Sequence, residues 1–267
     1  MKIGRETVPR TAICTSDEHT IVVRGRDLSR ELIGKVTFLE HFFLLLTGAL
    51  PTPAQARVLD ATLVAIAEHG LVPSVQAARM TFAAAPDALQ GAVAAGILGC
   101  GSVVLGSSET AGRLYGEIDA KMQQGVAADA AAREAMQAWR AAGRSIPGYG
   151  HPLHKERDER VDALFAVARE AGTDLRFVAI AETVEALLPE LLGKPLKLNV
   201  SGAIPAVLLG AGFPAAALRG VPILARTAGL IAHLYEEMQQ PAGFALSYQA
   251  TREAVYDGAV PDGFGKP

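Results

Sequence analysis

The sequence predicts an all-α protein with a minor β element near its N-terminus. Half of the 267 residues are hydrophobic but only 6% are aromatic, and alanine and glycine are abundant. Small side chains suit helices that pack closely together. Helix start and stop signals recur along the chain, whereas β-rich sequence is scarce. The length allows a sizeable core in one domain or two small ones.

The first elements are a hairpin and a capped helix. Residues 12–25, AICTSDEHTIVVRG, place polar turn residues before a β-rich run, which predicts a short hairpin. Residues 37–48, TFLEHFFLLLTG, open with a capping box formed by Thr37 and Glu40 and close at Gly48. The continuous apolar run inside this helix predicts that it is buried on most sides.

The next helix repeats these end signals. In residues 51–70, PTPAQARVLDATLVAIAEHG, Thr52 is the predicted N-cap, Gln55 reaches back to it, and Gly70 lies past the end. This prediction makes His69 the last residue of its helix, where the helix dipole favours a charged imidazolium. An ordinary helix-end histidine is the simpler interpretation of His69.

Helical periodicity and end signals continue to about residue 238. Residues 129–142 form a strong example, with Asp129 as the predicted cap and Gly143 as the stop. The predicted helices beyond residue 70 span 74–85, 88–103, 108–123, 129–142, 156–171, 176–192, 201–210 and 221–238.

The composition indicates which classes of protein the chain can belong to. The formal net charge of −3 gives no basic field, so we expect no nucleic-acid partner. Two cysteines without disulfide or metal spacing favour a reducing compartment, and the first ten residues lack a signal-peptide core. The uncharged stretches 88–108 and 198–218 are interpreted as buried helices and not membrane spans. We therefore expect a soluble, cytoplasmic protein.

One glycine-rich stretch is the main candidate site. In residues 144–160, RSIPGYGHPLHKERDER, Gly148 and Gly150 allow a tight turn that places His151 at the mouth of the next helix. The helix dipole would keep that imidazole neutral, able to donate to a carbonyl or accept a hydroxyl proton. Arg160, two and a half turns along the predicted helix, could bind a carboxylate through two hydrogen bonds. The alternative is a glycine-rich connector followed by a solvated helix start.

A second patch lies in residues 225–237, ARTAGLIAHLYEE. Arg226, His233 and Glu237 share one face of an otherwise apolar helix. A buried arginine needs a partner, which is either an internal carboxylate, with His233 a core residue, or an anionic substrate. No P-loop, dinucleotide fingerprint or metal-ligand spacing occurs, so no metal is expected. The residues alone suggest an all-α protein whose histidines and arginines converge on a polycarboxylate.

Four blocks, taken in order, resemble the citrate synthase superfamily. They are AEHG (67–70), IPGYGHPLHKERDER (146–160), LKLNVSGAIPAVLLGAGFP (196–214) and ARTAGLIAHL (225–234). The likeness covers about residues 10 to 240, and the length is most similar to citryl-CoA lyases, including the lyase module of ATP-citrate lyase. It implies a helical large domain of residues 1–107 with 208–267, a small domain of 108–207, and a homodimer or higher homo-oligomer.

The resemblance also assigns roles to residues. It implies that the acid substrate is bound by His69, His151, Arg160 and Arg226. It implies that His151 also polarises the carbonyl, or takes the hydroxyl proton in cleavage. Coenzyme A, present as an acyl-CoA substrate, would meet Pro147, Gly148, Tyr149, Gly150 and Lys155.

Two departures from the family pattern bear on catalysis. The family aspartate of the NVD block is replaced by Ser201, and the region around Val104 lacks the family histidine. A serine hydroxyl cannot act as a base at neutral pH without another base to activate it. We expect a citryl-CoA-lyase-like enzyme that cleaves or forms a C–C bond between an acyl-CoA and a keto acid such as oxaloacetate, with His151 and Ser201 as its catalytic residues. The alternative is a non-catalytic relative that binds coenzyme A or a polycarboxylate.

Overall fold

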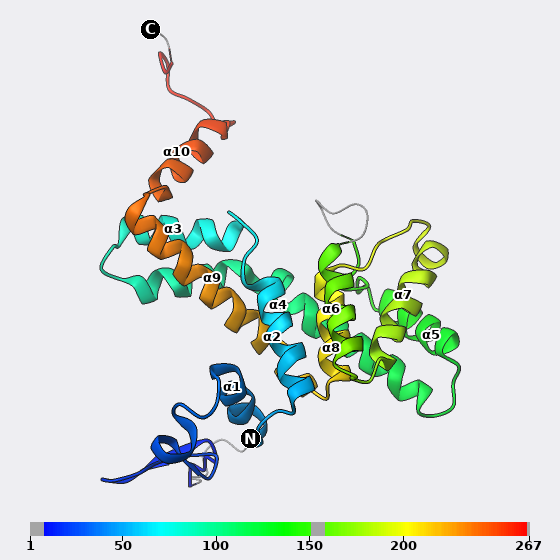
Figure 1. Cartoon of the computed structure of the whole chain (residues 1–267). Helices are drawn as coiled ribbons and strands as arrows, with labels where there is room; N and C mark the ends of the chain where they lie inside the picture. The colour runs from blue at the N-terminus through cyan, green and yellow to red at the C-terminus, as the bar shows by residue number, and fades with distance from the viewer. Residues whose placement is uncertain (1–7, 151–157, 266–267) are drawn as a thin grey trace. The chain divides into compact units, whose positions relative to one another are not determined.

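The computed structural model describes residues 8–150 and 158–265, and these are mainly helical, as predicted (Figure 1). The minor β element consists of β1 (Cys14–Ser16), β2 (Ile21–Val23) and β3 (Arg26–Asp27), paired antiparallel in that order. Its register pairs Cys14 with Val23, and Val23 with Arg26. The predicted hairpin is confirmed, with one strand more than expected.

Most predicted helices agree with the structure within three residues. After the π-helix η1 (Leu28–Leu32), and apart from the short 3-10 helix η2 (Ala215–Ala217), the α-helices are α1 (Phe38–Thr47), α2 (Pro53–Ala67), α3 (Pro73–Ala84), α4 (Leu89–Met122), α5 (Ala128–Ala141), α6 (Glu159–Glu170), α7 (Arg176–Leu192), α8 (Val200–Gly210), α9 (Gly220–Gln239) and α10 (Gly243–Glu253). The capping boxes predicted for α1 and α2 are present, with Glu40 Oε2 2.7 Å from the Thr37 amide and Gln55 Oε1 2.9 Å from the Thr52 amide.

The structure confirms one division between predicted helices and corrects other details. The predicted helices 88–103 and 108–123 correspond to the two parts of α4, Leu89–Ser102 and Val104–Met122, which meet at a kink next to Gly101, where glycine allows a φ of 56° at little cost. Helix α5 begins at Ala128 with Ala127 as its N-cap, so Asp129 lies in the first turn and is not the cap. Helix α10 was not predicted, because its few apolar residues gave no clear stripe.

The chain forms two compact units. Unit 1 contains the described residues of Met1–Ile66 and Leu105–Pro222, and unit 2 those of Ala67–Val104 and Ile223–Pro267. In unit 1, α8 packs against α6 and α7, and α5 packs against α7 (Figure 1). The core of unit 2 joins α3, the first part of α4 and α9 through a cluster of Val75, Ala78, Phe82, Ala92, Leu230 and Leu234. The two-domain division suggested by the resemblance stays a prediction.

Among the described residues, the segment Ala215–Gln239 is long and apolar enough to cross a membrane, and the two parts of α4 pass the same criterion together. Core helices of soluble proteins also meet this criterion, so length and apolarity alone do not decide between the two.

Candidate active site

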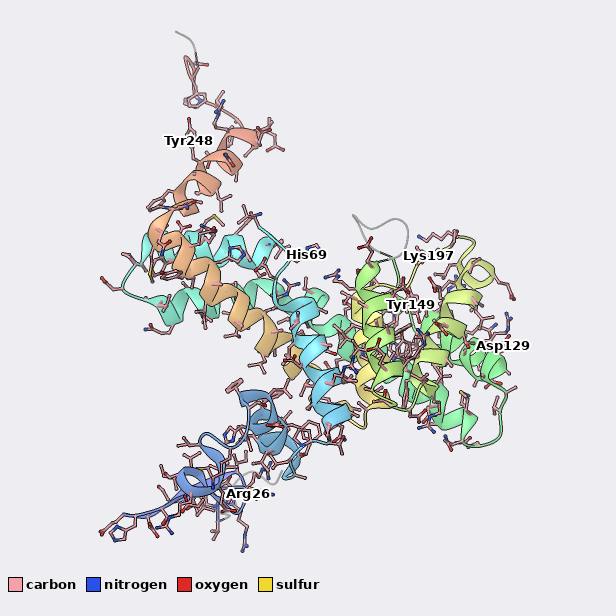
Figure 2. The ribbon with its side chains drawn as sticks, in the orientation of Figure 1. Arg26, His69, Asp129, Tyr149, Lys197 and Tyr248 are labelled. Atoms are coloured by element: carbon pink, nitrogen blue, oxygen red, sulfur yellow. The ribbon has the colours of Figure 1, made fainter. Side chains whose placement is uncertain are left out.

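The glycine-rich stretch is paired with the segment that leads into α8. Tyr149 and Leu198 form an antiparallel β-bridge, in which the Gly150 amide donates to the Lys197 carbonyl at 2.7 Å. The Asn199 amide donates to the Gly148 carbonyl at 3.0 Å. Figure 2 labels Tyr149 and Lys197 in this part of unit 1. The stretch is therefore held to the rest of unit 1 and is not a free connector.

Glycine is required at the closest point of this pairing. Gly148 has a φ of 87°, and a Cβ placed there would lie 2.6 Å from the Cα of Gly202. A Cβ on Gly202 would in turn lie 2.7 Å from the Gly148 carbonyl oxygen. Side chains do not tolerate such distances, so the two backbones touch only because both residues are glycine.

The Tyr149 side chain points into the protein core. Its hydroxyl lies 2.9 Å from the Tyr115 hydroxyl and donates to the Ala181 carbonyl at 2.9 Å. Burial, with the neighbouring Tyr115, raises the pKa of Tyr149 well above its usual value, so the phenol stays protonated. The predicted contact between Tyr149 and coenzyme A stays untested, and the structure leaves only its backbone for that role.

Helix α8 begins beside this loop. The Asn199 side chain caps the helix by accepting from the amides of Ser201 at 2.9 Å and Gly202 at 3.3 Å. The same side chain donates through Nδ2 to the Gly150 carbonyl at 2.6 Å. Ser201, half-buried in the first turn of α8, is thereby fixed relative to the loop. Asparagine before an apolar run is a usual cap signal, which would have identified Asn199 from the sequence.

Helix α6 begins at the same place, and here the sequence prediction was wrong. The helix starts at Glu159 with Asp158 as its N-cap, so Arg160 lies in the first turn and not two and a half turns along. Asp158, 3% exposed, accepts from Arg160 Nε at 2.9 Å and from Arg160 Nη2 at 2.8 Å. Asp158 Oδ2 also accepts from the Val200 amide at 3.2 Å. This carboxylate therefore joins the first turns of α6 and α8.

His69 belongs to unit 2 and lies two residues beyond the end of α2, not at its last residue as predicted. The Glu68 carboxylate accepts from the His69 amide at 2.7 Å and from His233 Nε2 at 2.9 Å. Burial alone would raise the pKa of Glu68, but these hydrogen bonds hold it below its usual value. The loop that carries His69 is thus attached to α9.

The His233 side chain is largely buried and is bonded within unit 2. Its Nδ1 lies 3.2 Å from Nη1 of Arg79, a buried arginine that the sequence analysis missed. Arg79 Nε donates to Glu237 at 2.6 Å, and Glu237 is also buried. Glu237 thus pairs with Arg79. The partner of Arg226, for which the sequence left an internal carboxylate or an anionic substrate as alternatives, stays a prediction. The position of Arg79 on the apolar face of α3, between Val75 and Phe82, was the available signal.

The Arg226 side chain is half-buried on α9, one turn before the point where α9 meets the end of α2. At that point a Cβ on Gly229 would lie 2.2 Å from the Ala67 carbonyl oxygen, so the helix approaches this closely only with glycine. Unit 2 therefore contains both His69 and Arg226.

The predicted site residues fall into two groups. Unit 1 brings together Gly148, Gly150, Arg160 and Ser201 through the hydrogen bonds of Asp158 and Asn199. Pro147 and Tyr149 also lie in unit 1, whereas unit 2 carries His69 and Arg226. His151 and Lys155 lie outside the described residues.

Residues 51–244 match the family description "Citrate synthase, C-terminal domain". The chain belongs to the citrate synthase family. A solved relative, the citryl-CoA lyase from Hydrogenobacter thermophilus, is 32% identical over 96% of both chains, with a TM-score of 0.82.

Longer proteins are also similar to this chain. The ATP citrate lyase of Methanosaeta concilii, solved with (3S)-citryl-CoA, is 22% identical with a TM-score of 0.74, over 97% of this chain and 43% of that one. A citrate synthase-like protein from Aspergillus oryzae, oryE, is 27% identical over 232 residues, 81% of this chain and 49% of that protein. The chain spans about half the length of the curated relatives it matches. Its helical, citrate-synthase-like fold is as the sequence predicted.

Proposed function

We propose that this protein is a citryl-CoA-lyase-like enzyme that cleaves, or in reverse forms, a C–C bond between an acyl-CoA and a keto acid such as oxaloacetate. The observation that carries the proposal is the cluster in unit 1, where Arg160 and the first turn of α8 are tied to the Gly148–Gly150 loop. A similarity in length and fold to the Hydrogenobacter thermophilus citryl-CoA lyase supports it.

The reaction requires one base and one site for a developing negative charge. In the cleavage direction, a base takes the proton from the tertiary hydroxyl of the citryl group, and the C–C bond breaks as the carbonyl of the keto acid forms. The electron pair moves into the enolate of the acyl thioester. Its α-carbon then takes a proton from solvent water, and the base returns its own proton to solvent, so that no net proton is gained or lost. We assign the base to His151, and the carboxylate contacts to His69, Arg160 and Arg226.

Ser201 takes the place of the family aspartate, and we assign it a different role. A neutral hydroxyl donates a hydrogen bond but removes no proton at neutral pH. Asn199 binds the Ser201 amide, which orients the residue at the N-terminus of α8, the end of a helix that favours negative charge. Ser201 would therefore stabilise the thioester oxygen as the enolate forms. Cleavage needs no base at this position, because no α-proton is removed in that direction.

We further propose that the protein works as a homodimer. Unit 2 exposes large apolar side chains on α9 and α10, and Tyr248 of α10 is labelled in Figure 2. Exposed fractions are 64% for Tyr235, 69% for Phe244 and 64% for Tyr248. Apolar groups gathered on neighbouring elements are typical of protein interfaces. Sedimentation equilibrium checks this, and a monomer at micromolar concentration would contradict it.

The direct test is to incubate the purified protein with citryl-CoA and follow acetyl-CoA and oxaloacetate by mass spectrometry. The variants are His151→Ala, which removes the proposed base, and Ser201→Asp, which restores the family residue. Loss of a general base lowers the rate by about 10²-fold to 10⁴-fold, so His151→Ala should abolish measurable turnover. Turnover by the wild-type protein that persists in His151→Ala would contradict the assigned base.

A second outcome would replace the proposal with the alternative considered from the sequence. If the wild-type protein is inactive while Ser201→Asp is active, the binding site is intact but lacks its base. The protein would then be a non-catalytic binder, or an enzyme for a different acyl-CoA.

A further inference from the structure

We propose that Asp158 is a positioning residue, which orients the Arg160 guanidinium so that its outer edge binds a carboxylate of the acid substrate. This inference rests on the proposed function and adds a residue to it. Nothing in the sequence pattern had singled out Asp158, because its contacts depend on where α6 starts.

The Asp158 carboxylate accepts four hydrogen bonds from two helix starts. Oδ1 accepts from the amide of Arg160 at 3.2 Å and from its Nε at 2.9 Å. Oδ2 accepts from Arg160 Nη2 at 2.8 Å and from the Val200 amide at 3.2 Å. The two guanidinium contacts are those of a bidentate pair, which fixes the plane of the guanidinium and not only its position.

Counting donors shows what this arrangement leaves for a ligand. A guanidinium has five N–H groups, and Asp158 takes two of them. A third, on Nη1, faces the Ala65 carbonyl at 3.5 Å. Within the described part of the chain, these contacts leave two N–H groups, one on Nη1 and one on Nη2. They point in parallel from the outer edge, which is the geometry that binds a planar carboxylate.

Burial keeps Asp158 in this role. It is 3% exposed, so little water competes for its oxygens. Burial alone would raise the pKa of Asp158, but its hydrogen bonds to Arg160 and the charge of that residue hold it below its usual value. A carboxylate that is ionised and fully bonded is a poor proton acceptor at neutral pH. Asp158 is therefore not a substitute for the missing family base, although it accepts from the amide of Val200, which directly precedes Ser201.

The bond to the Val200 amide extends the effect to α8. Val200 directly precedes Ser201, so one carboxylate sets both the Arg160 side chain and the first turn that carries Ser201. A simple N-cap needs only one acceptor, and serine caps a helix about as well as aspartate does. The substitution Asp158→Ser thus keeps the cap of α6 and removes the two hydrogen bonds to the Arg160 guanidinium.

The experiment is a double-mutant cycle with Asp158→Ser, Arg160→Met and the double variant. Asp129→Ser is the matched control, because it removes a carboxylate from the start of another helix in unit 1 without touching Arg160. Calorimetry gives Kd for citrate and for coenzyme A, steady-state assays give KM and kcat for citryl-CoA, and thermal unfolding reports the folded fraction.

We expect Asp158→Ser to weaken citrate binding by about 10-fold to 100-fold, since a misplaced binding group has effects of that size. The Kd for coenzyme A should stay within about 2-fold, and the double variant should bind citrate no worse than Arg160→Met alone. Should Asp158→Ser fail to fold, Asp158→Asn, which keeps one oxygen for Arg160 Nε, takes its place.

The outcomes separate this inference from the proposed function. Additive losses in the cycle, or equal losses of citrate and coenzyme A affinity, would overturn the positioning role. A non-additive cycle in citrate affinity without any cleavage of citryl-CoA would support Asp158 while the proposed activity fails. Activity that vanishes in Asp158→Ser at unchanged citrate affinity would make Asp158 a catalytic residue and overturn the inference. A wild-type protein that binds no citrate and cleaves no citryl-CoA would overturn both.

Discussion

The close approach of Gly148 and Gly202 leads to a quantitative prediction for Gly148→Ala. Two costs add at this position. An L-residue at a φ of 87° costs about 1 kcal/mol, and a Cβ 2.6 Å from the Cα of Gly202 forces two backbone segments apart. Overpacking of that kind costs about 1–3 kcal/mol. The free energy of unfolding should therefore fall by about 2–4 kcal/mol.

Gly150→Ala is the matched control. Gly150 has a similar φ of 80°, but its Cβ would lie 3.4 Å from Leu196 Cδ2, an ordinary contact with a flexible side chain. Only the conformational cost of about 1 kcal/mol applies there. For a chain of this size each kcal/mol lowers Tm by about 2–4 °C, so Gly148→Ala should melt about 4–16 °C lower and Gly150→Ala only about 2–4 °C lower.

Urea unfolding followed by circular dichroism measures both variants under the same conditions. Equal midpoints for Gly148→Ala and Gly150→Ala would refute the reasoning, because the steric cost is the only difference between them. A large loss at Gly148 would also show that the loop pairs with the start of α8 in solution.

Three further predictions concern the described contacts. Asn199→Ala should lower the free energy of unfolding by about 2 kcal/mol, about half from the lost helix cap and half from the lost hydrogen bond to the Gly150 carbonyl. Asn199→Asp keeps the cap, so it should lose only the contribution of the hydrogen bond to Gly150. Urea unfolding measures both variants. Arg79→Leu should lower the free energy of unfolding by about 3–5 kcal/mol, because Glu237 stays buried without its cation. A double variant with Glu237→Leu should recover most of the lost free energy of unfolding. Burial alone would raise the pKa of Glu237, but the Gly243 amide and Arg79 hold it below 4.5. The ionised Glu237 should therefore contribute its full stabilisation above about pH 4.5, and this contribution should be lost as the pH falls through the lowered pKa of the folded protein. In a Glu237→Gln variant, the free energy of unfolding should change less with pH in this acidic range.

Local signals predicted the helices well. Capping boxes at Thr37 and Thr52 involve residues three positions apart, so the sequence contains the whole interaction. The same holds for the hairpin at residues 12–25. These elements depend on neighbours along the chain, and the structure confirms them.

The site depended on contacts that no local pattern contains. Asp158 meets Val200 across 42 residues, and Arg79 meets Glu237 across 158. The helix that contains Arg160 was predicted to begin too early in the chain, which placed Arg160 further along it than the first turn. The roles of His151 and Lys155 stay predictions, because those residues lie outside the described part of the chain.

The order in which the chain is synthesised has a consequence for unit 2. The apolar face of α3, with Val75 and Phe82, packs against Leu230 and Leu234 of α9, and all of unit 1 after Ile66 is made in between. Translation at about 5–20 residues per second separates these partners by roughly 7–30 seconds. Unit 1 can therefore complete its core first on the ribosome. Chains that pause before α9 would present that α3 face to chaperones, and the unit that carries His69 and Arg226 would be the last to form.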